Sequence, residues 1–192
     1  MPRKADAKLE NRILDAAYEL WSKRGEKALT MRAVARAAGT TTPTVYQRFE
    51  DKRDLLVLLR DRSLKNLVSV LQPAHSPVEV CRRFLAYAAI HPHEYRLLTS
   101  DWGARLSRDN EPRPTFEIIK KRLASHLGGE PEQHSRLALA LGALLHGTAT
   151  MLMADGVQLH VARQLRSICS EACETLISSA AAKRDSQLGT QK

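Results

Sequence analysis

The residues from Thr30 to Leu55, TMRAVARAAGTTTPTVYQRFEDKRDL, constrain the fold of this chain more than any other stretch. The first apolar positions recur at the three- and four-residue spacing of a helix, and they are Met31, Val34, Ala35 and Ala38. Gly39 marks the end of this helix, because glycine readily adopts the left-handed conformation that follows a helix end. Val45 and Phe49, four residues apart, are the apolar anchors of a second short helix. The order of helix, glycine turn and short helix predicts a helix-turn-helix motif.

The residues that flank these helices carry the signals of helix starts. Thr30 precedes the first helix, where a threonine side chain accepts a hydrogen bond from an otherwise unpaired backbone N–H. Pro43 suits the first turn of the second helix, since its missing N–H is not needed there. Asp51 precedes a further, long helix, and Asp54 completes a variant of the capping box. Local chemistry therefore predicts three consecutive helices in this segment.

Helical periodicity continues to the end of the chain, and no alternating strand pattern competes with it. The predicted helices span about residues 9–23, 30–38, 42–49, 51–72, 77–90, 94–102, 116–127, 131–154 and 159–182. Ser76-Pro77 and Gly128-Gly129 are the clearest breaks between them. We therefore expect an all-α fold of about nine helices, with an N-terminal three-helix head and a C-terminal helical bundle.

The same pattern predicts how the 192 residues divide into domains. We expect a mobile basic arm over residues 1–8 and a helix-turn-helix domain over 9–54. A second helical domain is expected over 55–182, and a polar tail over 183–192. The boundary near residue 54 falls inside the fourth helix, so no flexible linker is needed between the two domains.

Charge is concentrated on the segment that carries the helix-turn-helix pattern. The chain has a formal net charge of +9, and residues 1–65 hold 15 Lys and Arg against 9 Asp and Glu. A basic surface favours an anionic partner, and its coincidence with this motif favours DNA. A solvated basic face is the simpler alternative, and the coincidence argues against it.

Several residues of this segment match a known family. Ala38-Gly39, Thr44-Val45-Tyr46, Phe49, Lys52 and Leu55 stand where the TetR family of bacterial transcriptional regulators shows Ala-Gly, Thr-Leu-Tyr, Phe, Lys and Leu. The chain therefore resembles that family over about its first quarter. Pro43 stands where many members carry Gly, and Gln47-Arg48 replace a common His-Tyr. The resemblance consequently implies binding of double-stranded DNA without specifying the bases that are read.

The resemblance and the residue types together give candidate DNA contacts. In the family the positions of Tyr46 and Lys52 typically bind phosphates, and Thr44 is expected to do the same. Short polar side chains at the start of the second helix of the motif are able to bond base edges, and a threonine methyl is able to meet a thymine methyl. The full candidate set is Thr30, Arg32, Thr41, Thr42, Thr44, Tyr46, Gln47 and Lys52.

The last two predicted helices are long and apolar over wide faces. Gly142, Ala143 and Gly147 are small residues that suit close packing between helices. A chain of this size has difficulty burying both helices alone, and the family pairs them with their copies in a four-helix dimer interface. We therefore expect a homodimer whose interface includes Leu141, Leu145, Leu165, Ile168, Cys169, Ala172 and Leu176.

In the family the C-terminal helices also enclose a small-molecule pocket. Leu144-Leu145-His146-Gly147, with the earlier His91-Pro92-His93-Glu94-Tyr95-Arg96, partly resembles a subgroup with a Trp-His-Gly signature, Leu145 replacing the Trp. The resemblance implies a small apolar or aromatic effector. Candidate pocket residues are Phe84, Tyr87, Tyr95, Trp102, Phe116, Leu123, His146 and Met151. Plain core packing is the alternative for each of them.

Other functions have weaker support. The polar N-terminus and the absence of any apolar run near 18 residues predict neither a signal peptide nor a membrane segment, and three sparse cysteines suit a cytoplasmic protein. No cofactor is expected. His91 with His93, and Cys169 with Cys173, lack a convincing third metal ligand. No motif of an enzyme appears. The resemblance implies a regulator that an effector releases from a palindromic site, most simply a repressor. The alternatives are an effector-independent architectural DNA-binding protein or an all-helical enzyme in the C-terminal half.

Overall fold

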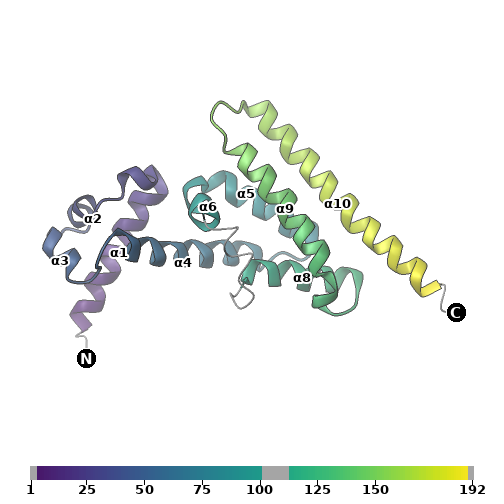
Figure 1. Ribbon diagram of the computed structural model, residues 1–192, viewed down its shortest axis with the longest axis horizontal. Helices are drawn as coiled ribbons and strands as arrows, with labels where there is room; N and C mark the ends of the chain where they lie inside the picture. Colours follow the sequence, from purple (N-terminus) through teal and green to yellow (C-terminus); the bar gives the residue numbers. More distant parts are fainter. Residues whose placement is uncertain (1–3, 101–112, 190–192) are drawn as a thin grey trace. The chain divides into compact units, whose positions relative to one another are not determined.

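The computed structural model describes residues 4–100 and 113–189, which form helices joined by short turns (Figure 1). These residues contain no strand, so the predicted all-α fold is confirmed. The α-helices are α1 (Lys4–Arg24), α2 (Met31–Ala37), α3 (Thr42–Tyr46), α4 (Lys52–Leu71), α5 (Pro77–Ile90), α6 (Pro92–Thr99), α8 (Pro114–Leu127), α9 (Ser135–Leu152) and α10 (Leu159–Gly189). Two 3-10 turns, η1 (Glu26–Ala28) and η2 (Pro131–His134), complete the description.

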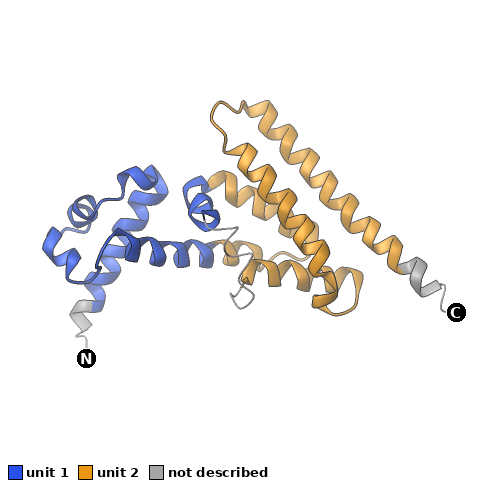
Figure 2. Ribbon diagram, viewed as in Figure 1, with its two compact units in different colours: residues 1–66, 91–107 blue, residues 67–90, 108–192 orange. Residues whose placement is uncertain are grey.

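The chain forms two compact units, coloured separately in Figure 2. The first, which we call the head, comprises residues 1–66 and 91–107, and the second, the bundle, comprises 67–90 and 108–192. The boundary therefore lies twelve residues beyond the expected position near 54, within α4, and α6 belongs to the head. The physical reason is that Leu55 and Leu59 of α4 and Leu97 of α6 are buried in the same apolar core as α1 to α3.

The core of the head is formed by the apolar faces that the sequence predicted. Its innermost residues come from four different helices, and they are Ile13, Ala17, Val34, Val45 and Leu55. Trp21, Met31 and Phe49 enclose them. Because α2 and α3 are too short to be stable as isolated helices, this burial holds the motif in place.

The bundle packs α5, α8, α9 and α10 around a second core. α9 lies against α10, as Figure 1 shows, and it also packs on α5 and α8. The predicted start of α5 is confirmed, since Ser76 Oγ accepts a hydrogen bond from the Glu79 N–H at 3.1 Å. Glu79 in turn accepts from the His75 N–H, one residue before the cap, at 2.7 Å, in a variant of the capping box.

Several boundaries differ from the predicted ones. α1 begins at Lys4, so residues 4–8 are helical and not a separate arm, since no Gly or Pro interrupts them. α10 continues to Gly189, beyond the predicted end at 182, because the alanine-rich segment from 180 favours a helix. The helix predicted from 131 is divided into η2 and α9. Pro131 and the capping box at Glu130 fix a separate turn there.

Candidate DNA-binding surface

Both helices of the motif begin at a threonine cap. Thr30 Oγ1 accepts a hydrogen bond from the Ala33 N–H at 3.1 Å, which starts α2. Thr41 Oγ1 accepts from the Thr44 N–H at 3.3 Å, which starts α3. Gly39 lies between them with a φ of 62°, a conformation that other residues rarely adopt. The predicted helix-turn-helix geometry is therefore present, with α3 three residues shorter than expected.

Two of the candidate DNA contacts, Thr41 and Thr44, bind each other. The hydroxyl oxygens of Thr41 and Thr44 lie 2.8 Å apart. The Thr41 oxygen thus accepts from the backbone of α3 and shares a hydrogen bond with the Thr44 hydroxyl, so part of its bonding capacity is used within the motif. Sequence reasoning placed Thr41 among the base readers; the structure gives it a capping role in the free protein.

Tyr46 and Gln47, at the end of α3, are open to solvent, and Thr42 is half-buried. Tyr46 is 53% exposed although it is a large aromatic residue, and Gln47 is exposed at the end of the helix. Val45, between Thr44 and Tyr46, is fully buried, as predicted. α3 therefore presents a hydroxyl and a carboxamide on one side and anchors itself on the other, which is the arrangement that a groove-reading helix requires.

Lys52 has a partner that the sequence did not reveal. Its Nζ donates to the Glu26 carbonyl oxygen at 3.2 Å and lies 3.4 Å from Glu26 Oε1. The interaction joins the start of α4 to η1. Because both side chains are substantially exposed, the ion pair is weak and open to exchange for a phosphate. Arg32, on the outer face of α2, is also exposed.

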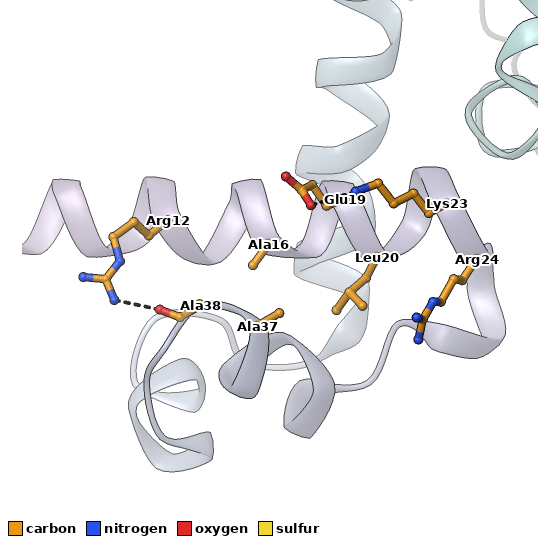
Figure 3. A pocket seen from close by; sticks show the side chains of 8 residues that line it. All are labelled: Arg12, Ala16, Glu19, Leu20, Lys23, Arg24, Ala37 and Ala38. Carbon is orange, nitrogen blue, oxygen red and sulfur yellow. Dashed lines mark hydrogen bonds and ion pairs between the residues drawn. The ribbon is translucent and has the colours of Figure 1, made fainter.

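A further basic residue lies beside the turn of the motif. Arg12 of α1 donates through Nη2 to the Ala38 carbonyl oxygen at 2.7 Å, as the dashed line in Figure 3 shows. Arg12 lies at one end of a hollow of about 400 Å³ between α1 and α2. Its wall carries three cations and one carboxylate: Arg12, Lys23, Arg24 and Glu19. Sequence reasoning missed Arg12, since only the packing of α1 on α2 brings it to the turn.

The described candidate effector-pocket residues are divided between the head and the bundle. Tyr95 lies in the head, at 1% exposure, whereas Phe84, Tyr87, Phe116, Leu123, His146 and Met151 belong to the bundle. Met151 is 54% exposed, so it does not line an enclosed cavity in this chain, and Leu123 and Tyr87 are buried. Burial lowers the pKa of the half-buried His146. Trp102 lies outside the described residues.

The candidate dimer residues divide by burial. Leu141, Leu145 and Cys169 are buried within the single chain, at 0%, 5% and 2% exposure, so they offer almost no surface to a second copy. They fill the core between α9, α10 and α5. Ile168 and Leu176 are exposed on α10, and Leu165 and Ala172 are half-buried beside them. An apolar face thus remains on α10, formed by four of the predicted residues.

The three cysteines lie in the bundle core. Cys81, Cys169 and Cys173 are all free and buried, and burial raises the pKa of the Cys169 thiol. Within the part of the chain that the structure describes, no three His, Cys, Asp or Glu side chains are arranged to hold a metal ion. No helix among the described residues is long and apolar enough to cross a membrane.

Comparison with protein families gives two matches that together cover both units. Residues 13–59 match the family described as bacterial regulatory proteins, tetR family. Residues 78–176, more than half of the chain, match the family described as tetracyclin repressor-like, C-terminal domain. The resemblance predicted from the first quarter of the sequence is therefore confirmed and extended to the bundle.

Individual relatives are more distant. An uncharacterised HTH-type transcriptional regulator of Bacillus subtilis, YvkB, is 34% identical over 61 residues, 32% of each protein. Another, from Mycobacterium tuberculosis, is 26% identical over 133 residues, 69% of this chain and 59% of the relative. The chain thus spans less than two thirds of the length of either relative.

Solved structures share the fold. A TetR regulator from Streptomyces coelicolor superimposes with a TM-score of 0.62 at 22% identity, over 90% of this chain and 97% of that one. A TetR-like regulator from a Rhodococcus species gives 0.57 at 22% identity, over 95% and 98%. At this level of identity the similarity establishes the arrangement of helices alone.

Proposed function

This chain belongs to the TetR family of bacterial regulatory proteins, and from that premise we propose that it is a sequence-specific DNA-binding transcriptional regulator. We further propose that it is a repressor, released from a palindromic operator by a small-molecule effector. The observation that carries the proposal is the surface of α3, where Tyr46 and Gln47 are exposed while Val45 anchors the helix.

The contacts to DNA are proposed residue by residue. Tyr46, Lys52, Arg32 and the start of α2 at Thr30 bind phosphates and so set the position of the head on the duplex. Gln47 and Thr42 read base edges from α3. Thr44 binds a further phosphate, and Thr41 supports this surface as the cap of α3. The net charge of +9 supplies the long-range attraction.

The proposed regulator is a homodimer that pairs through α9 and α10. The residues that support this pairing are exposed and apolar, and they are Leu139, Met151, Val161, Ile168 and Leu176. A methyl group added to Gly142 or Gly147 would meet no atom within 4 Å in the single chain. Glycine inside a helix lowers its stability by roughly 1 kcal/mol, so the close approach of a second copy is the reason we offer for glycine there.

The proposed switch is a change in the distance between the two heads. Two recognition helices enter successive major grooves only when their centres lie about 34–36 Å apart. An effector that binds the bundle more tightly in another dimer shape shifts the population toward it and releases the operator. The half-buried aromatic residues Phe84 and Phe116 of the bundle support an apolar or aromatic effector.

Selection of bound sequences from random duplex DNA tests the proposal. An enriched inverted repeat, bound by the purified protein at physiological salt, is the expected result, and it gives the site for effector screening. Salt-sensitive binding without sequence preference would favour an effector-independent architectural protein. An absence of binding would overturn both readings and direct attention to an activity of the bundle, for which the described residues show no catalytic arrangement.

A further inference from the structure

The head contains a hollow between α1 and α2, beside the turn of the helix-turn-helix motif (Figure 3). Its volume is about 400 Å³, and all the residues that line it belong to the head. A cavity of this size suits a small organic molecule. None of the residues proposed to contact DNA or the effector lines it, so it is a separate candidate site.

Small side chains leave this space open where the two helices meet. Ala16 of α1 and Ala37 and Ala38 of α2 line the hollow, and Leu20 is the largest apolar side chain in its wall. Ala16 and Leu20 pack against the core of the head, so the core fixes this part of the wall. The hollow therefore offers a preformed apolar surface to the middle of a bound molecule.

The charges in the wall of the hollow do not cancel. Arg12, Lys23 and Arg24 are positive, and Glu19 is the single negative residue among those that line it. Lys23 Nζ lies 3.1 Å from Glu19 Oε2, so these two side chains form an ion pair. Two positive charges remain for an occupant, and they belong to Arg12 and Arg24.

Arg12 is held in position at one end of the hollow. Its Nη2 donates to the Ala38 carbonyl oxygen at 2.7 Å, across the contact between α1 and α2. Among the described residues Arg12 makes no other hydrogen bond, so the remaining N–H donors of its guanidinium are available. A planar guanidinium that is already oriented suits a carboxylate, because less side-chain freedom is lost on binding.

Arg24 lies at the other end, as the last residue of α1. It has no hydrogen-bond or ion-pair partner in the parts of the chain that the structure describes. Figure 3 shows both guanidinium groups on the side of α1 that faces α2, with Ala16 and Leu20 between them. The positions of Arg12 and Arg24 differ by twelve residues, which corresponds to about 18 Å along a helix. The two unpaired charges are therefore too far apart for one compact anion.

We propose that this hollow is a ligand site of the head, and that it binds an elongated organic dianion with an acidic group at each end and an apolar chain between them. One acidic group pairs with Arg12 and the other with Arg24. The apolar chain lies along Ala16, Leu20 and Ala37. The site is separate from the effector pocket proposed for the bundle, and the inference does not depend on the proposed function.

Titration of the full-length protein with dodecanedioate tests the site. This linear dicarboxylate is the probe because its extended chain is comparable in length with the separation of the two arginines along α1. In protein with carbon-13-labelled alanine methyl groups, the NMR signals of Ala16, Ala37 and Ala38 are expected to shift and to saturate at millimolar or lower concentration. The absence of saturable shifts at these three residues would overturn the proposal. Shifts confined to buried alanines of the bundle, such as Ala138 and Ala149, would overturn it too.

Replacement of single cations tests which charges bind the probe. Arg12→Gln and Arg24→Gln are each expected to weaken binding at least about fivefold, since each removes a charge-assisted contact. Lys27→Gln is the matched control, because it removes one exposed positive charge of the head that lies outside the hollow. Its affinity is expected to stay within about twofold of the wild type, because salt screens a distant charge. Equal losses in all three variants would contradict the site and would show that the net charge alone attracts the probe.

Ala37→Leu tests the hollow without a change of charge. Ala37 is exposed at the end of α2, so the fold tolerates a larger side chain there, and unchanged thermal unfolding confirms it. The added atoms fill the hollow, and binding of dodecanedioate is expected to weaken at least about tenfold. Wild-type affinity in this variant would refute the proposed location.

The number of acidic groups is tested with ligands of the same chain length. Dodecanoate carries one carboxylate, and we expect it to bind the wild-type hollow at least about fivefold more weakly than dodecanedioate, because one arginine stays unpaired. The uncharged dodecanediol is expected to bind more weakly still. Equal affinity for dodecanoate and dodecanedioate at the alanines of the hollow would rule out a site for a dianion.

Discussion

The hydroxyl oxygens of Thr41 and Thr44 lie 2.8 Å apart at the start of α3, and Thr41 also caps the helix. The side chain of Thr41, at the start of the proposed DNA-reading helix, therefore stabilises that helix. Gln47, at the opposite end of α3, is exposed and free to read a base. We therefore expect Thr41 to affect the stability of the head, and Gln47 to affect the preference for DNA sequence.

Thr41→Ala is expected to lower the free energy of unfolding of the head by about 1 kcal/mol, since the α3 cap is lost. Its operator preference should stay that of the wild type. Gln47→Ala is expected to leave stability unchanged and to relax selection at one base pair in each half-site. Urea denaturation and repeated sequence selection measure the two quantities. A changed consensus with Thr41→Ala would contradict this division of roles.

Lys52 is expected to exchange Glu26 for a DNA phosphate. Lys52→Gln should weaken binding to specific and random duplexes alike and reduce the salt slope by about one unit. Glu26→Gln should strengthen binding to both, since the competing carboxylate is removed while the carbonyl contact remains. Titrations at several salt concentrations measure both effects. Glu19→Gln, which alters an exposed pair on α1, is the control.

Substitutions of Ile168 and Leu141 test which apolar residues form the dimer interface and which fill the core of one chain. Ile168→Asp is expected to give a folded monomer, because the side chain is exposed in the single chain and would be buried at the proposed interface. Leu141→Ala is expected to lower stability by about 2–5 kcal/mol without a direct effect on association. Sedimentation and thermal unfolding measure the two outcomes. A dimeric Ile168→Asp would refute the proposed pairing.

The raised pKa of the Tyr18 hydroxyl predicts that the head loses stability in alkaline solution. Burial and the Glu94 carboxylate raise this pKa from 10.0 to about 12 in the folded head, so the folded protein holds this proton more tightly than the unfolded chain. The resulting stabilisation is complete below pH 10 and disappears as the pH rises from 10 to 12. The ultraviolet absorbance of ionised tyrosine follows the titration. A Tyr18→Phe variant that titrates like the wild type would show that this assignment is wrong.

The sequence allowed the head to be predicted in detail because its signals are local. Thr30, Gly39 and the alternation of buried and exposed residues around Val45 act within one or two turns of helix. The family matches confirm the same assignment over residues 13–59. The predicted dimer residues divide between the core and the surface of the single chain, because an apolar residue on a long helix has the same periodicity whether it faces its own chain or a second copy.

By itself, the sequence determined the helices, their caps and the family, since hydrophobic period, capping residues and glycine turns act between near neighbours. Only the tertiary structure decided that Leu141 and Leu145 fill the core of the bundle while Ile168 stays exposed. It alone brought Arg12 to the turn of the motif and Glu94 to Tyr18. These pairs are separated by 26 and 76 residues, and no local pattern encodes a contact that depends on how whole helices pack.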